Sequence, residues 1–187
     1  MTARSEIRAR YEKRRRRIGG LLIGSVVLTT IVVTVGFWGF RLNLTPSAAL
    51  GIWRIVELER PARKGDRVFV CPPLSGALQE GLRRGYLRRG LCAGGVAPLI
   101  KTVSATSGQF ISIAGFVRID GEVLPHSRLM EFDGEGRPLS PHVGGLVPPG
   151  AVYLHSDFPG SFDSRYFGPV ATTNILGLAQ EVWTREP

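Results

Sequence analysis

The stretch Pro98-Leu99-Ile100-Lys101-Thr102-Val103-Ser104-Ala105 places one lysine inside an otherwise apolar and β-branched run. Such a run, with proline before it and Ser107-Gly108 after it, predicts a short strand. Apolar neighbours lower the pKa of a lysine, because desolvation disfavours its charged form. A neutral amine is a useful base, so Lys101 is a candidate for chemistry. The ordinary alternative is an edge-strand lysine that extends its amine into water.

Other short extended runs, separated by Gly, Pro and Ser, lie on both sides of this stretch. Asp120-Gly121 suits the positive φ angles of a tight hairpin turn and predicts a hairpin over Val117–Val123. The segment Ser75–Arg89 is compatible with one short helix, and Pro125–Pro149 has the composition of a long surface excursion. We therefore expect a mostly β domain with antiparallel strands. The strands are expected at Ile52–Val56, Arg67–Val70, Leu99–Val103, Phe110–Ile113 and Ala151–Leu154.

Upstream of these runs, Ile18–Phe40 contains no charged residue. As a helix this segment would be roughly 34 Å long, which is enough to cross a hydrocarbon core of roughly 30 Å. Trp38 suits the outer interface of a membrane. The alternative is a cleaved signal peptide with small residues at Ser47-Ala48-Ala49, but the apolar cores of such peptides run to only about 7–15 residues. We therefore predict a single transmembrane helix over residues 18–40 that contacts the lipid bilayer.

The charge of the 187-residue chain is concentrated before this helix. Residues 1–17 hold eight Lys or Arg and two Glu, a net +6 out of the +9 of the whole chain. Clustered basic residues can bind nucleic acid, but beside an apolar span the positive-inside rule accounts for them and no nucleic-acid partner is needed. The prediction is a basic cytoplasmic tail at 1–17 and a periplasmic domain at 41–187, as for a single-pass protein of a bacterial inner membrane.

The chain has two cysteines, Cys71 and Cys92. The bacterial periplasm is oxidising, so they are candidates for one disulfide bond, with two unpaired thiols as the alternative. A bridge across this loop would stabilise the fold by about 3 kcal/mol in the chain-entropy model. Neither cysteine has the spacing of a metal ligand.

Directly after the apolar span, Leu44-Thr45-Pro46-Ser47 brings a serine close to the predicted membrane surface. A serine hydroxyl and a neutral lysine form a complete pair of nucleophile and base without a histidine. Taken alone, Ser47 after a proline is usually a turn residue. A serine/histidine pair is a further alternative, but no motif connects a histidine with Ser47, and nothing predicts a metal or cofactor. The histidines are His126, His142 and His155.

Three segments occur in a fixed order: Thr45-Pro46-Ser47, the Lys101 run, and Gly160-Ser161-Phe162-Asp163-Ser164-Arg165-Tyr166-Phe167-Gly168. In this order they resemble the bacterial type I signal peptidases, which are serine/lysine endopeptidases. The opening Asn43 to Ser47, Cys71-Pro72-Pro73, and Arg84-Gly85-Tyr86-Leu87 before Cys92 are similar to the TraF-type branch, the conjugative transfer peptidases that mature pilin precursors. The resemblance covers essentially the whole chain after the apolar span.

The resemblance implies a role for each matching residue. Ser47 would be the nucleophile and Lys101 the general base. The Ser47 backbone N–H and the Thr45 hydroxyl would stabilise the oxyanion, and Ser161 would orient the lysine amine. Asp163 and Arg165 match a charged pair that supports the site, and for Asp163 two roles stay open, a structural one and a direct electrostatic one near Lys101. Read alone, Thr45 and Ser161 are ordinary turn or loop residues, and Asp163 with Arg165 could be an exposed ion pair worth under about 1 kcal/mol.

The chain also departs from the common type I enzymes. Ala48-Ala49 follow Ser47 where those enzymes have Met and a nearby Pro, and their Gly-Asp-Asn reads His155-Ser156-Asp157 here. These differences favour the specialised branch, whose substrate is an exported pilin precursor and whose partners include type IV secretion or mating-pair components. That branch can also join the pilin ends into a circle. The alternatives are a general signal peptidase acting on proteins with signal peptides and a catalytically silent, anchored scaffold of a secretion apparatus.

Overall fold

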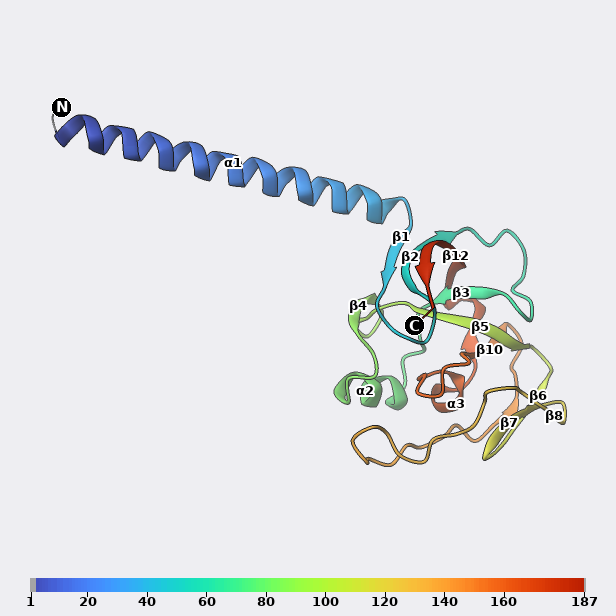
Figure 1. The fold of residues 1–187 in the computed structure, drawn as a ribbon. Helices are drawn as coiled ribbons and strands as arrows, with labels where there is room; N and C mark the ends of the chain where they lie inside the picture. The colour runs from blue at the N-terminus through green and yellow to red at the C-terminus, as the bar shows by residue number, and fades with distance from the viewer. Residues whose placement is uncertain (1–2, 187) are drawn as a thin grey trace. The chain divides into compact units, whose positions relative to one another are not determined.

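The computed structural model of the chain describes residues 3–186 (Figure 1). The chain divides into two units, residues 1–40 and 41–187, which we describe separately. The first unit is helix α1 (Ala3–Phe37), in which Glu12–Thr34 is long and apolar enough to cross a membrane. A signal sequence near an N-terminus has the same properties, so α1 indicates a membrane anchor or a signal sequence. The assignment of residues 1–17 to a cytoplasmic tail, 18–40 to a membrane span and 41–187 to a periplasmic domain stays a prediction. The helix ends at Phe37 and not at the predicted Phe40, which is the first residue of a strand.

Two threonines in the apolar part of α1 satisfy their hydroxyl groups inside the helix. Thr30 donates to the Val26 carbonyl at 2.9 Å and Thr34 donates to the Thr30 carbonyl at 2.8 Å. A polar group without a partner is costly in a hydrocarbon environment. These bonds make the threonines compatible with a membrane segment.

The second unit is built from two β-sheets, as expected for a mostly β domain. The larger sheet has the strand order β1-β2-β12-β3-β5-β10-β11 and the smaller one has the order β8-β7-β6-β9. The pairings from β2 to β11 in the larger sheet, and all those in the smaller one, are antiparallel. The strands are β1 (Phe40–Asn43), β2 (Leu50–Val56), β3 (Arg67–Val70), β4 (Arg89–Cys92), β5 (Leu99–Thr106), β6 (Phe110–Ala114), β7 (Phe116–Ile119), β8 (Glu122–Val123), β9 (Gly145–Leu146), β10 (Ala151–His155), β11 (Val170–Ala171) and β12 (Ile175–Arg185).

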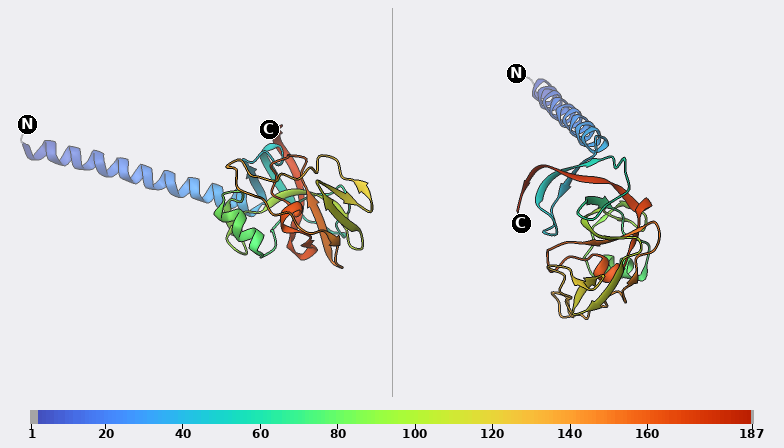
Figure 2. Two further views of the ribbon diagram at one scale, coloured as in Figure 1. Left: turned by 90° about the horizontal axis from the view of Figure 1, so that it is seen from below. Right: turned by 90° about the vertical axis from the view of Figure 1, so that its right-hand side faces the viewer.

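All five strands predicted from the sequence are present, in β2, β3, β5, β6 and β10. The predicted hairpin is β7 and β8, and its turn residues Asp120 and Gly121 have φ angles of 52° and 88°. The long strand β12 was not predicted. It pairs with β2 on one side and β3 on the other (Figures 1 and 2). Its glycine, Gly177, and its charged residues Glu181 and Arg185 interrupt the apolar pattern of a strand, and pairing with the two neighbouring strands stabilises it.

The three helical segments of the second unit are short: α2 (Gly76–Arg83), α3 (Ser164–Phe167) and a 3₁₀ turn, η1 (Thr172–Asn174). Helix α2 begins at Ser75, whose side chain accepts the Leu78 N–H. It ends at Arg83 and not at Arg89, because Gly85 adopts a φ of 78°, which ends a helical segment. Residues 125–149 form the expected excursion, with β9 near its end.

The core of the second unit lies on both sides of β5. Val103 packs with Val68 and Leu154 in one cluster, and Ala105 packs with Tyr153 in another. Strand β5 pairs with β3 on one side and β10 on the other. It is therefore a central strand, and the edge-strand alternative for its lysine is wrong.

Cys71 and Cys92 form a disulfide bond, as the sequence predicted. The bond connects the residue after β3 to the end of β4, with a Cα–Cα distance of 5.6 Å. Cys92 packs with Leu78, Leu87 and Val96 in a small core of its own. The disulfide thus joins the α2–β4 segment to the strand that lies next to β5.

Candidate active site

Lys101 lies in the middle of β5, and its side chain is only 3 % exposed. Its Cα is opposite Val68 of β3, and the next residue, Thr102, is opposite His155 of β10. Burial lowers the pKa of Lys101 to about 8; the charge of Asp163 opposes this shift and that of Arg165 adds to it. A substantial fraction of the amine is therefore neutral near physiological pH, as general-base chemistry requires.

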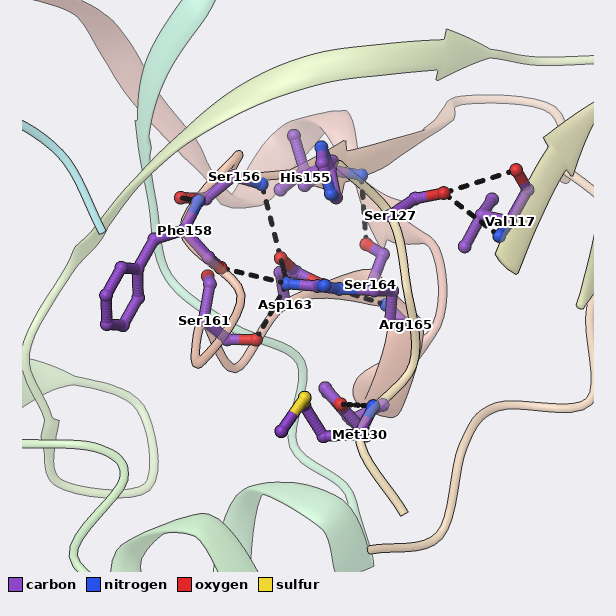
Figure 3. A network of polar contacts seen from close by, with 12 residues as sticks. Val117, Ser127, Met130, His155, Ser156, Phe158, Ser161, Asp163, Ser164 and Arg165 are labelled. Atoms are coloured by element: carbon purple, nitrogen blue, oxygen red, sulfur yellow. Dashed lines mark hydrogen bonds and ion pairs between the residues drawn. The ribbon is translucent and has the colours of Figure 1, made fainter. Parts of the chain in front are cut away.

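The Lys101 amine donates a hydrogen bond to the Ser161 hydroxyl at 2.7 Å. This is the contact that the sequence predicted for Ser161, although its effect on catalysis stays a prediction. Ser161 is 3 % exposed. Its carbonyl in turn accepts from Arg165 Nη2 at 3.1 Å (Figure 3). The residue is therefore fixed at both its side chain and its backbone.

Asp163 and Arg165 form a fully buried, bidentate ion pair (Figure 3). Arg165 Nε and Nη2 each lie 2.8 Å from an Asp163 carboxylate oxygen. Asp163 also caps α3 by accepting the Arg165 backbone N–H, and it accepts the Ser156 N–H at 3.2 Å. The exposed-pair alternative is excluded, since both side chains are 0 % exposed. Burial with this many hydrogen bonds makes the pair a rigid support for the surrounding loop.

Ser47 is half-buried in an irregular loop between β1 and β2, which we call the Ser47 loop (residues 44–49). Asn43 holds this loop together. Its amide donates to the carbonyls of Thr45, Ala48 and Ala49 at 2.9–3.0 Å. Its side-chain oxygen accepts the Thr45 N–H. In the sequence, Asn43 stands out only as the first residue of the Asn43–Ser47 motif, and nothing there indicates its role in organising this loop.

The Thr45 hydroxyl donates to Asn43 Oδ1 at 2.7 Å. A hydroxyl has one proton to donate, so in this arrangement Thr45 contributes to the internal bonding of the Ser47 loop. To serve as an oxyanion donor it would first have to rotate away from Asn43. That role stays a prediction.

Ser47 and Lys101 line the same space. Two cavities, of about 260 and 410 Å³, share Pro46, Ser47, Ile100, Lys101 and Phe158 in their walls. Within residues 3–186 no hydrogen bond joins Ser47 directly to Lys101. The larger cavity continues over apolar side chains on one side, while the smaller one is more polar. Those apolar side chains include Leu42, Leu44, Phe69, Leu87 and Leu99.

A second residue that the sequence analysis missed is Ser156. Its hydroxyl donates to the Ser47 carbonyl at 2.7 Å, across a separation of 109 residues. The only sequence signal was a departure from a family motif at this position, and it did not indicate a contact with the Ser47 loop.

The histidines give little support to a serine/histidine pair. His155 lines the smaller cavity, but its Nε2 atom is buried without a hydrogen bond. Burial lowers its pKa, as it does that of the half-buried His142. His126 is exposed. No cluster of three or more metal-binding side chains occurs within the described residues.

Comparison with protein families matches residues 15–184 to the signal peptidase family, peptidase S26. A probable conjugal transfer protein TraF of Sinorhizobium fredii is 52 % identical over 178 residues, with 93 % of this chain and 95 % of that protein covered. A conjugal transfer protein TraF of Agrobacterium tumefaciens is 51 % identical over 175 residues, covering 93 % of this chain and 99 % of that protein.

Among solved structures, a signal peptidase I of Enterococcus faecalis aligns with 65 % of this chain and 98 % of its own length. The sequence identity is 18 % and the TM-score is 0.40, so no argument rests on it. The family match and the two relatives are sufficient: the chain belongs to the peptidase S26 signal peptidase family. Its resemblance to the TraF-type branch is confirmed, and the family implies a serine peptidase with a signal-peptidase-like role in conjugation.

Proposed function

We propose that the chain is a membrane-anchored serine endopeptidase in which Ser47 is the nucleophile and Lys101 the general base, and that it cleaves an exported pilin precursor. One observation carries the proposal: a buried lysine with a pKa of about 8 borders the same cavities as Ser47. A lysine buried in a central strand destabilises the fold. A buried lysine with a lowered pKa beside a cavity is therefore a candidate for a functional residue. The names of the relatives support a role in conjugal transfer, and the pilin substrate is proposed from the resemblance to the TraF-type branch.

In the proposed reaction, Ser47 Oγ attacks the scissile carbonyl carbon and its proton passes to Lys101 Nζ. The Ser47 backbone N–H, and Thr45 after its hydroxyl rotates, stabilise the oxyanion, a contribution of roughly 3 kcal/mol for each donor. The C–N bond then breaks, and the leaving amine takes the proton from Lys101. Ser161 holds the lysine amine in place throughout. An ester between Ser47 and the substrate remains.

The acyl-enzyme is resolved in one of two ways. Water gives a linear product, whereas attack by an amine of the same pilin closes the chain into a circle. Both outcomes fit the proposed serine/lysine mechanism, and the mass of the product distinguishes them. The apolar larger cavity suits the small apolar side chains before a cut site.

The proposed location is the bacterial inner membrane, with α1 as the anchor, its basic end in the cytoplasm and residues 41–187 in the periplasm. The basic residues before the apolar segment support this orientation through the positive-inside rule. The disulfide bond is consistent with an oxidising compartment. Type IV secretion or mating-pair proteins are the proposed neighbours there.

The experiment is mass spectrometry of the major pilin precursor, co-expressed with the intact chain, Ser47→Ala or Lys101→Ala. Ser107→Ala and Lys64→Ala are matched controls, because both residues are exposed. We expect a mature product with the intact chain and both controls, and none with the two site variants. A further mass loss of one water would show that the ends are joined.

The other outcomes overturn parts of the proposal. An identical product in all cells would assign the cleavage to another enzyme. An unchanged precursor in all cells would exclude this substrate, and complementation of the essential signal peptidase activity would then identify a general peptidase. A transfer phenotype that survives Ser47→Ala but not removal of the anchor would identify a scaffold.

A further inference from the structure

We infer that Ser156 is a positioning residue that sets the place of Ser47 relative to Lys101; this inference rests on the proposed function. Its hydroxyl donates to the Ser47 carbonyl at 2.7 Å. Among the described residues, this is the one side-chain hydrogen bond that joins the Ser47 loop to the part of the domain that carries Ser161 and Asp163.

Lys101 and Ser47 are held in place by different parts of the structure, and a bond between these parts is needed to fix the distance between the two residues. Lys101 is fixed by the backbone pairing of β5, while Ser47 lies in a loop whose remaining side-chain bonds come from Asn43 and Trp53. Those two residues hold the loop to β1 and β2 and do not set its distance from Ser161. Pro46 restricts the chain before Ser47 through its fixed φ angle. The bond from Ser156 restrains the carbonyl side of Ser47, and with it the Cα atom, to which the Cβ–Oγ side chain and the backbone nitrogen are bonded.

Ser156 is itself held rigidly. It is 7 % exposed, and its backbone N–H donates to Asp163 Oδ2 at 3.2 Å (Figure 3). The partner of that carboxylate, Arg165, donates to the Ser161 carbonyl. One buried ion pair thus fixes both Ser156, which contacts Ser47, and Ser161, which contacts Lys101. The hydroxyl proton of Ser156 is committed to Ser47, so Ser156 acts through Ser47 and not on the substrate.

The test compares Ser156→Ala with Ser156→Thr, which keeps the hydroxyl, and with Ser127→Ala as the matched control. Ser127 is also a buried serine whose hydroxyl bonds to backbone groups, those of Val117 and Leu124 (Figure 3). The readouts are kcat and KM for precursor cleavage, the pH midpoint of the rate, and the unfolding temperature, with kcat measured below the unfolding transition of every variant.

We expect Ser156→Ala to lower kcat by about 10²-fold, the effect of a displacement on the order of 1 Å between reacting groups. KM and the pH midpoint should not change, because burial, Asp163 and Arg165 determine the pKa of Lys101. Ser156→Thr should restore most of kcat. Ser127→Ala should match Ser156→Ala in unfolding temperature while keeping the kcat of the wild type.

Three results would overturn the inference alone: a wild-type kcat for Ser156→Ala, an equal loss of kcat for Ser127→Ala, or a folded Ser156→Thr as inactive as the alanine variant. Cleavage that is unaffected by Ser47→Ala would overturn the proposed function, and this inference with it. The two failures are therefore distinguishable in one set of variants.

Discussion

Lys101 and Ser47 border the same cavities, yet they are held in place by different means. Lys101 belongs to a central strand, where backbone pairing on both sides and a buried environment fix its position. Ser47 belongs to a loop that is organised by the side chains of Asn43 and Ser156. The sheet itself therefore positions Lys101, whereas a few polar side chains and the packing of Ala49 against Trp53, Phe69 and Ile100 position the Ser47 loop.

The buried pair of Asp163 and Arg165 supports both halves, so breaking it should have the largest effect. Arg165→Met leaves the Asp163 carboxylate buried without its partner. We expect the free energy of unfolding to fall by about 3–5 kcal/mol, measured by denaturant titration. The control is Glu181→Gln, which removes an ion pair with Arg67 in which both side chains are over 40 % exposed; it should cost under about 1 kcal/mol. An equal decrease in the free energy of unfolding for the two variants would show that the buried ion pair stabilises the domain no more than an exposed one.

Replacing the base should separate stability from activity. A lysine with a lowered pKa destabilises the folded state at any pH where the unfolded chain is protonated. We expect Lys101→Met to abolish cleavage while raising the free energy of unfolding at pH 7 by up to about 3 kcal/mol, from the shift between 10.5 and about 8. The stability of the wild type should then rise with pH from about 8 to 10.5, and the gap to the variant should close. A variant less stable than the wild type at pH 7 would contradict the burial argument.

On the serine side, Asn43→Ala removes the side chain that organises the Ser47 loop. Loss of its hydrogen bonds leaves the part-buried carbonyls of Thr45 and Ala48 without this donor, while Ala49 keeps its bond from Trp53, so we expect a loss of about 1–3 kcal/mol in the free energy of unfolding. The rate of cleavage should fall while its pH midpoint stays unchanged, because Asn43 does not contact Lys101. A shifted midpoint in pH–rate measurements would contradict this expectation, because it would mean that the Ser47 loop also sets the pKa of the base.

The sequence predicted the lysine half better than the serine half. The apolar runs of β3, β5 and β10 indicate buried strands by composition alone, and Asp120-Gly121 indicates its turn. Local chemistry is sufficient for such elements. Strand β12 was missed because Gly177 and the polar residues Gln180 and Glu181 interrupt its apolar pattern, and its pairing partners lie more than a hundred residues away in the chain.

In the candidate active site, too, contacts between residues distant in the chain could not be predicted from the sequence. The motif order identified Ser47, Lys101 and Ser161, and in the structure all three line the larger cavity. The contact between Ser156 and Ser47 spans 109 residues and has no local signature. A hydrogen bond of this kind depends on the register of the folded chain, which a single sequence does not reveal.

The most direct test of the account is the pH dependence of kcat/KM for precursor cleavage by the wild type, with Ser47→Ala as the background. The account predicts a rate that rises with pH as Lys101 loses its proton and levels off above a midpoint of about 8. A rate that is flat from about pH 6 to 10 would contradict a lysine base and, with it, the proposed pair of Ser47 and Lys101.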